Sequence, residues 1–258
     1  MTNAVEKIVP KLLNTYKTKQ PIEFIRNEYI LDEETSYSIQ EEFIKRKCKQ
    51  ENDEVVGYKI SMTSAETQAI AKTHEPAYGT LLTSNLVKSG DSVSLSSLFT
   101  PLIEPEIMFI LTEDLSPETD EEEILSKSKI AAGIEIPDAR YIDWFPNFSL
   151  TDLLCDNTAT GLVVVSNPMD PLSLEELANV KMDLFFNGEK ISEGFSSAVL
   201  GNPVTSVAWL SKKLAKKNKT LKKGMVISSG TFISPLFVEK GTYTVNYSNI
   251  GKTEITFE

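Results

Sequence analysis

The 258-residue chain contains one histidine, His74, and two cysteines, Cys48 and Cys155. A single histidine cannot supply a histidine-rich zinc site, and a Ser-His-Asp triad would depend on His74 alone. We expect His74 to be an exposed loop residue. The two cysteines lack C-x-x-C spacing, so the sequence predicts neither a disulfide framework nor a thiolate zinc site. We interpret both cysteines as small hydrophobic residues of the core.

The chain also lacks a long apolar run, and its charge is predominantly acidic. No window approaches the ~20 apolar residues of a membrane span, and the N-terminus does not have the basic and then apolar pattern of a signal peptide. We therefore expect a cytoplasmic location. The net charge of −11 argues against a nucleic-acid partner or an anionic membrane, because both require clustered basic residues. One basic cluster, 212–223, is interpreted as the solvated end of a helix.

The sequence predicts an α+β fold with a helical N-terminal segment, 1–53, and a mixed, mainly β domain, 54–258. Apolar residues recur with a helical period near the N-terminus, where Pro10 either kinks the first helix or begins it. A second helix is expected over 32–50. The further expected elements are a strand over 55–62, a helix over 64–72, a turn over 74–82, a strand over 101–111, a helix over 116–127, strands over 130–137 and 162–165, a short helix from 150, a strand over 180–186 with an Asn187-Gly188 hairpin, a helix from Asn202, and strands over 225–228, 241–247 and 252–257.

The stretch 101–111 reads PLIEPEIMFIL, which places Glu104 and Glu106 in an otherwise apolar run. In a strand the two side chains project from one face, roughly 7 Å apart. A third apolar run, IAAGIEIP, again contains a single carboxylate, Glu135. Carboxylates in such surroundings repel one another and lose solvation unless a cation or a proton lies between them. The pattern therefore indicates a site for a hard divalent ion. The alternative is a strand with one face in water.

Lys59 is the one charged residue of the predicted strand over 55–62. A lysine in such a strand often protects the exposed edge of a sheet. The alternative is that its ammonium group points into a pocket. The sequence leaves both interpretations open.

Seven motifs, in order, resemble the bacterial 2-keto-4-pentenoate hydratases and 4-oxalocrotonate decarboxylases, a family of the fumarylacetoacetate hydrolase superfamily. The resemblance extends from about Gly57 to Phe257. The motifs are GYKISMTS at 57–64, PAYGTL at 76–81, PLIEPEI at 101–107, IEIPDAR at 134–140, DNTATG at 156–161, LGNPVTSVAWL at 200–210 and SSGTF at 228–232.

The resemblance implies a β-rich domain of the fumarylacetoacetase C-terminal type, commonly assembled as a homo-oligomer. It implies that Glu104, Glu106 and Glu135 ligate Mg²⁺ or Mn²⁺, and that Lys59 acts as a catalytic residue beside the substrate. The substrate implied is a small 2-oxo acid of aromatic catabolism. By position in the motifs, the resemblance also implies substrate contacts from Tyr78, Gly79, Leu81, Arg140, Ser229 and Gly230.

The chain departs from the family's pattern at a few positions. Hydratases of the family typically carry aspartate where this chain has Ala77, whereas decarboxylases tend to have an apolar residue there. Ser61 replaces a common glycine, and Thr158-Ala159 replaces the usual Ala-Ser. We therefore expect a metal-dependent lyase, a hydratase first and a decarboxylase as the alternative. A third interpretation is an acylpyruvate-type C–C hydrolase that uses His74 as a base, and a fourth is a non-catalytic module with a structural ion.

Overall fold

The computed structural model describes residues 3–258. Two long helices form its N-terminal part, α1 (Asn3–Thr18) and α2 (Glu33–Glu51). At the start of α2, the Asp32 side chain accepts a hydrogen bond from the Thr35 amide, an N-cap that satisfies a backbone donor without a partner inside the helix. Helix α1 turns Ile8 and Leu12 into the same continuous core as the β-rich remainder of the chain.

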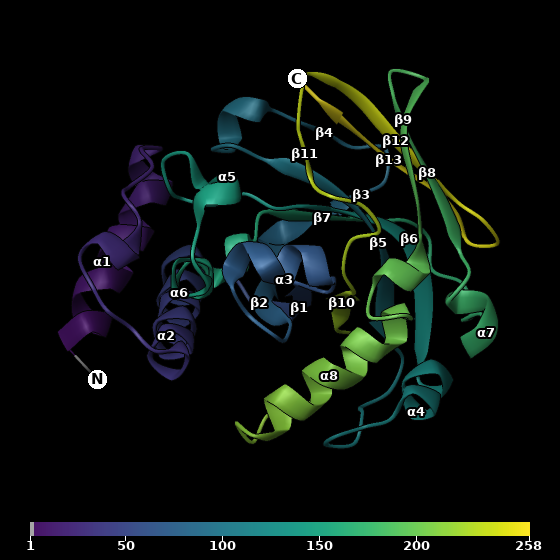
Figure 1. Cartoon of the computed structure of the whole chain (residues 1–258), viewed down its shortest axis with the longest axis horizontal. Helices are drawn as coiled ribbons and strands as arrows, with labels where there is room; N and C mark the ends of the chain where they lie inside the picture. The colour runs from purple at the N-terminus through teal and green to yellow at the C-terminus, as the bar shows by residue number, and fades with distance from the viewer. Residues whose placement is uncertain (1–2) are drawn as a thin grey trace.

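A mixed sheet forms the centre of the molecule (Figure 1). Most neighbouring strands are antiparallel, but β1 and β10 are parallel, as are β3 and β7. In spatial order the strands are β2 (Ala77–Leu82), β1 (Val55–Ser61), β10 (Val226–Ser228), β5 (Leu102–Leu111), β6 (Ser128–Ile136), β7 (Leu162–Val165) and β3 (Leu86–Lys88), and β11 (Leu236–Phe237) also pairs with β5.

A second sheet packs against β6 and β7 at the end of the molecule away from α1 (Figure 1). The Tyr247 hydroxyl joins the two layers by donating a hydrogen bond to the Gly133 carbonyl, 2.7 Å away. In spatial order the strands of this second sheet are β4 (Ser92–Val93), β13 (Gly251–Phe257), β12 (Gly241–Tyr247), β8 (Lys181–Phe186) and β9 (Glu189–Phe195).

Short helices and turns connect and cover the strands. Among them, α8 packs against β1 and α4, and α6 packs against α2. The remaining α-helices are α3 (Ala65–Ala71), α4 (Glu121–Ser126), α5 (Trp144–Asn147), α6 (Leu150–Cys155), α7 (Leu174–Leu177) and α8 (Pro203–Ala215). The 3₁₀ turns are η1 (Ile25–Asn27), η2 (Thr83–Asn85), η3 (Leu95–Ser97), η4 (Asn157–Ala159) and η5 (Ser196–Ala198).

Turn η4 closes the outer edge of β2. The Asn157 side chain accepts from the Thr80 amide at 2.7 Å and donates to the Thr80 carbonyl at 2.9 Å, as a neighbouring strand would. Thr158 Oγ1 donates to the Tyr78 carbonyl at 2.6 Å. Turn η4 leads directly into β7, which lies near the other edge of the sheet. These bonds therefore bring the two edges of the sheet toward each other. The sheet therefore curls around the face that carries Lys59.

The α+β class is confirmed, and several expected elements agree with the structure within a few residues. The expected turn over 74–82 is wrong, because Ala77–Leu82 is strand β2, paired antiparallel with β1. The expected helix over 116–127 begins only at Glu121, where Asp120 is the N-cap. Helix α1 begins at Asn3 and runs through Pro10. The division of the chain at residue 53 stays a prediction.

Three other expectations concern single residues and the membrane. His74 is exposed, as expected. Cys155 is buried, and Cys48 is half-buried. No helix within residues 3–258 has the length and apolar character that crossing a membrane requires.

The shared core predicts that damage to α1 lowers the stability of the whole molecule. Leu12 is fully buried, and Leu12→Ala should lower the free energy of unfolding by about 2–5 kcal/mol. Urea denaturation followed by circular dichroism should show one transition at a lower midpoint. Lys7→Ala, on the exposed side of the same helix, is the control. A separate early transition in the Leu12 variant would show instead that α1 belongs to an independent unit.

Candidate active site

Three buried glutamates meet on adjacent strands. Glu104 of β5 pairs directly with Glu135 of β6, and Glu106 pairs with Gly133. Each glutamate offers one carboxylate oxygen within 4.8 Å of those of the other two. The exposed fractions of Glu104, Glu106 and Glu135 are 9%, 1% and 1%. The expectation of a strand with one face in water is therefore wrong. Alternation along β5 and register with β6 bring the three carboxylates together.

Few hydrogen-bond donors of the protein contact these carboxylates. Oε2 of Glu106 accepts hydrogen bonds from the Ser228 hydroxyl and, at 2.8 Å, from the Gly230 amide. Oε1 of Glu106 and both oxygens of Glu135 are buried without a hydrogen-bond partner. A buried carboxylate oxygen without a donor is costly, so the arrangement calls for a cation.

Lys59 supplies one positive charge. Its strand, β1, lies between β2 and β10, so the edge-strand interpretation of Lys59 is wrong. The side chain is 2% exposed, and Nζ lies 2.7 Å from Oε1 of Glu135, an ion pair without hydrogen-bond geometry. One ammonium cannot balance three carboxylates.

The electrostatics of the glutamates reflect this imbalance. Burial raises the pKa of Glu104 from 4.5 to about 8, the charge of Glu135 adds to the increase, and Lys59 opposes it. Burial also raises the pKa of Glu106 well above its ordinary value, with further increases from Glu135 and Glu104. The site thus requires protons or a cation. Its donors are all carboxylate oxygens, the ligands that Mg²⁺ and Mn²⁺ prefer. Glu104, Glu106 and Glu135 therefore fit such an ion.

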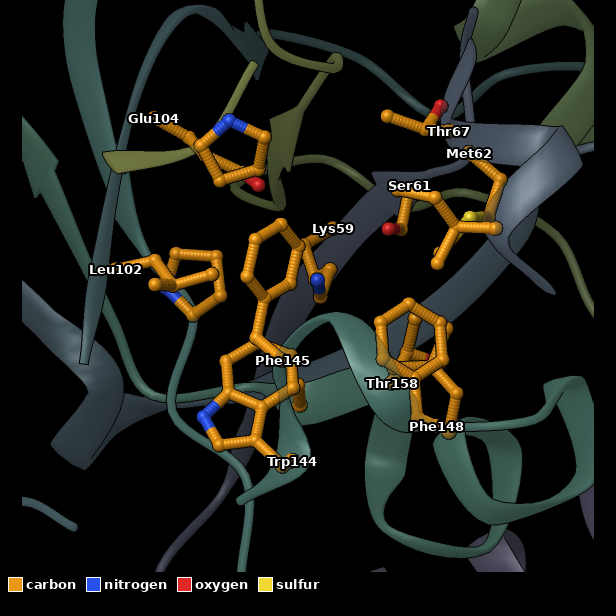
Figure 2. A pocket seen from close by; sticks show the side chains of 15 residues that line it. Lys59, Ser61, Met62, Thr67, Leu102, Glu104, Trp144, Phe145, Phe148 and Thr158 are labelled. Carbon is orange, nitrogen blue, oxygen red and sulfur yellow. The ribbon is translucent and has the colours of Figure 1, made fainter. Parts of the chain in front are cut away.

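A small cavity of about 30 Å³ opens beside the carboxylates. Lys59 and Glu104 line it, and so do the hydroxyl-bearing residues Ser61, Thr67 and Thr158. Figure 2 shows the rings of Trp144, Phe145 and Phe148 on the other side, with Phe145 facing Lys59. The cavity thus has one charged side and one aromatic wall.

The residues expected to contact substrate fall into two groups. Gly79 pairs with Lys59 across β1 and β2, and Gly230 donates to Glu106. Ser229, next in the chain to Gly230, uses its hydroxyl to bond the Ile107 carbonyl at 2.7 Å. These three therefore lie close to the carboxylates and Lys59, but they do not line the cavity. Tyr78 and Leu81 do not line the cavity: Tyr78 stacks on Tyr37 with ring centroids 4.7 Å apart, and Leu81 belongs to a small apolar cluster.

Arg140 does not line the cavity either. Its Nε donates to Asp156 at 2.6 Å, and its Nη1 donates to the carbonyls of Asp138 and Thr160. Asp156 precedes η4, and Thr160 follows it. The buried guanidinium therefore braces the loop that carries Thr158, and its contacts are with the chain itself.

Sequence reasoning gave no role to Ser228 or to the aromatic wall. Ser228 lies within the SSGTF motif, where it pairs with Lys59 across β1 and β10 and bonds Glu106. The wall derives from the segment DWFPNF at 143–148. Its three aromatic residues within five positions were a visible signal. The segment lacks helical or strand periodicity, however, so the sequence did not show which way the rings point.

Comparisons with known proteins identify relatives of the chain. No model of a protein family matches the chain. The chain is 30% identical over 98% of its length to 2-keto-4-pentenoate hydratase of Paraburkholderia xenovorans, of which the match covers 94%. It is 32% identical over 88% of its length to 2-keto-4-pentenoate hydratase of Burkholderia vietnamiensis, covering 86%. It is 36% identical over 71% of its length to 2-hydroxyhexa-2,4-dienoate hydratase of Comamonas testosteroni, covering 70%.

Solved structures are similar to most or nearly all of the chain. 4-Oxalocrotonate decarboxylase from Pseudomonas putida G7, complexed with magnesium and adipate, has a TM-score of 0.90 at 26% identity, over 98% of this chain and 97% of that one. Fumarylpyruvate hydrolase from Pseudomonas aeruginosa has a TM-score of 0.60 at 12% identity, over 78% of this chain and 88% of that one. The second likeness concerns the fold alone.

The carboxylate cluster predicts that one substitution weakens metal binding. Glu106→Gln keeps the size of the side chain but removes the charge next to Glu104 and Glu135. Calorimetric titration should show the affinity for Mg²⁺ falling at least tenfold, equivalent to ~1.4 kcal/mol. Glu122→Gln, an exposed acid of α4, should bind Mg²⁺ like the unmodified protein. Unchanged affinity in the Glu106 variant would contradict the assignment.

The raised pKa of Glu104 predicts how the metal-free protein responds to pH. Because the folded-state pKa, about 8, exceeds the ordinary 4.5, the folded state retains a proton that the unfolded state releases between these values. This contribution to stability is full below pH 4.5 and is lost as pH rises to about 8. In EDTA, Glu104→Gln should remove part of that decline, as measured by urea denaturation at several pH values. Parallel pH profiles of the two proteins would contradict the prediction.

Proposed function

Since the chain belongs to the family of 2-keto-4-pentenoate hydratases and 4-oxalocrotonate decarboxylases, within the fumarylacetoacetate hydrolase superfamily, we propose that it is a divalent-metal-dependent lyase of 2-hydroxydienoate and 2-oxo-enoate acids. The preferred reaction is the addition of water to a 2-hydroxydienoate. The observation that carries the proposal is the cluster of Glu104, Glu106 and Glu135 with Lys59. Glu104 and Lys59 of this cluster line one cavity.

Each group of side chains has a separate role in the proposed reaction. The three glutamates would hold Mg²⁺ or Mn²⁺, which supplies a Lewis acid for the 2-oxo acid head of the substrate. Ser228 and the Gly230 amide fix the orientation of Glu106. Lys59 Nζ lies beside Glu135 at the edge of the cavity, where it can donate or accept a proton or stabilise negative charge that develops on the C2 oxygen.

The aromatic wall would contribute by excluding water. Trp144 is 3% exposed and Phe148 is 7% exposed, so both rings present a packed, dry surface. A low-dielectric wall strengthens the interaction between Lys59 and a charged intermediate. Gly79, Ser229 and Gly230 would shape the backbone around the head group.

The alanine at position 77 makes decarboxylation the second candidate reaction. Ala77 pairs with Ser61, two residues along β1 from Lys59, and therefore lies on the same side of the sheet. The carboxylate that hydratases of the family carry there is absent. Because residue 77 is alanine, no acid at this position can activate water. The hydroxyl group directly opposite Ala77 is that of Ser61, which lines the cavity. The hydratase assignment rests instead on sequence relatives that are 30–36% identical and bear hydratase names.

The other interpretations are weaker. A C–C hydrolase would need a base, but His74 is exposed and does not line the cavity. A purely structural ion site would not need Lys59 to point toward the carboxylates, yet it does. We also propose a cytoplasmic homo-oligomer. Unpaired cysteines and the exposed apolar side chains of Phe195 and Phe237 are compatible with this.

The role of Lys59 can be separated from metal binding. Lys59→Met keeps the apolar stem and removes the ammonium, so kcat should fall by about 10²-fold or more. Calorimetry should meanwhile show near-normal Mg²⁺ affinity. Lys240→Met, at an exposed surface position, is the matched control. Normal turnover by the Lys59 variant would mean that the ammonium is only a charge partner of Glu135.

The type of reaction can be tested with two substrates. With Mg²⁺ present, 2-hydroxypenta-2,4-dienoate should lose its ultraviolet absorbance, and an oxalocrotonate-type diacid should release little CO₂. Ala77→Asp should raise the hydration rate if water activation is limiting. Release of CO₂ from the diacid without hydration of the dienoate would identify the protein as the decarboxylase. Absence of both activities would refute the lyase proposal.

A further inference from the structure

We infer that the Ser61 hydroxyl binds and orients the water molecule that the hydratase reaction adds to its substrate. The inference rests on the proposed function, because it takes hydration as the reaction and Lys59 as the group that transfers protons. Since Ala77 stands where hydratases of the family carry an acid, another group near Lys59 must hold the water. The position of Ser61 and its free hydroxyl fit this role.

Ser61 lies directly opposite the position that lacks the acid. Strands β1 and β2 are antiparallel, and Ser61 pairs with Ala77 across them. Directly paired residues, and residues two apart in one strand, project from the same face of a sheet. The side chains of Ser61, Ala77 and Lys59 therefore share one face. Both Ser61 and Ala77 depart from the family pattern, so a hydroxyl on one strand accompanies the loss of a carboxylate from its neighbour.

Two other hydroxyl groups line the cavity, but both already have partners. Thr67 Oγ1 donates to the Ser64 carbonyl at 3.1 Å within the N-terminal cap of α3. Thr158 Oγ1 donates to the Tyr78 carbonyl at 2.6 Å. The Ser61 hydroxyl makes no hydrogen bond to any of residues 3–258, and in Figure 2 its oxygen points into the cavity. Its proton and both of its lone pairs are therefore free to bond a water molecule.

The cavity suits water in size and in polarity. Its volume of about 30 Å³ is enough for one or two water molecules. A water molecule inside a protein typically makes about three hydrogen bonds. Ser61, Lys59 and Glu104 all line this cavity, so a hydroxyl, an ammonium and a carboxylate are available to one molecule. The rings of Phe145 and Phe148 offer it no such bond, so the polar groups set its orientation.

Ser61 acts as a positioning residue, because a serine hydroxyl is too weak a base to take a proton from water at neutral pH. In the addition, the water oxygen bonds to the carbon β to the ketone, and the electron pair of the carbon–carbon double bond moves to give the enolate. The water proton passes to Lys59 in its amine form, and the resulting ammonium returns a proton to C3. The sum is the addition of one H₂O, with nothing oxidised or reduced.

Substitutions at Ser61 test this role by separating kcat from KM. Ser61→Ala should lower kcat for hydration of 2-hydroxypenta-2,4-dienoate about tenfold, roughly the effect of one hydrogen bond, and should leave KM within about twofold. Ser61→Thr keeps the hydroxyl and should retain most of the rate. Ser38→Ala, at an exposed position on α2, is the control. An unchanged kcat in Ser61→Ala would overturn the inference, as would a raised KM with normal kcat, which would identify a substrate contact.

A step without addition of water gives a second readout. With Mg²⁺ present, the site should exchange the C3 protons of 2-oxopentanoate with D₂O, because enolisation requires the ion and Lys59 but no water held by Ser61. Nuclear magnetic resonance should show equal exchange rates in Ser61→Ala and in the unmodified protein, which also shows that the variant is folded. A loss of exchange that matches the loss of hydration would mean that Ser61 supports the whole site, and would refute its role with water.

Restoring the acid tests the relation between the two positions. Combining Ser61→Ala with Ala77→Asp should raise the hydration rate at least about fivefold above that of Ser61→Ala, because the carboxylate can hold the same water. A double variant with normal exchange and no regained hydration would contradict the inference.

The outcomes for this inference and for the proposed function differ. If the unmodified protein and Ser61→Ala hydrate the dienoate equally, the role of Ser61 fails and the lyase proposal stands. If the unmodified protein hydrates no dienoate, the hydratase assignment fails and the role of Ser61 fails with it.

Discussion

The repulsion among three buried carboxylates is the constraint on which the site depends. Glu104, Glu106 and Glu135 lie within the strands of the central sheet, where water cannot solvate them. Moving one of them to the surface would require moving a strand, because each side chain direction is fixed by the pleat and by the pairing of β5 with β6. The fold thus holds ligands together whose charges oppose their meeting. It can do so when protons or a cation balance these charges.

The residues around the three glutamates orient them or shape the adjacent cavity. Strand β10 places Ser228 between Lys59 and Glu106, and the chain that follows brings the Gly230 amide to the same carboxylate. Arg140 and Asp156 brace the turn that closes β2 and presents Thr158 to the cavity. Charged and apolar surfaces therefore meet across a short distance.

The three glutamates that the sequence singled out come together in the structure, and they could be recognised because a carboxylate in an apolar strand is a local anomaly. The α+β class followed in the same way from short periodic runs. Strand β2 was mistaken for a turn because Pro76 and Gly79 are turn residues by local preference. Pairing with β1 and the bonds from Asn157 outweigh that preference. The side on which Lys59 points, the partners of Arg140 and the orientation of Phe145 all depend on contacts distant in sequence, which no local pattern contains.

The position of β10 has a consequence for how the chain folds. This strand joins β1 to β5, yet it comes after β9 in the chain and lies far from both in sequence. During synthesis β1 and β5 leave the ribosome long before β10, the strand that pairs with both. Until then each of them has one edge without its partner strand. Pairings so distant in sequence slow folding and leave partly folded chains prone to association. The ammonium and the carboxylates can therefore come together only after most of the protein has left the ribosome. Until then they can remain hydrated.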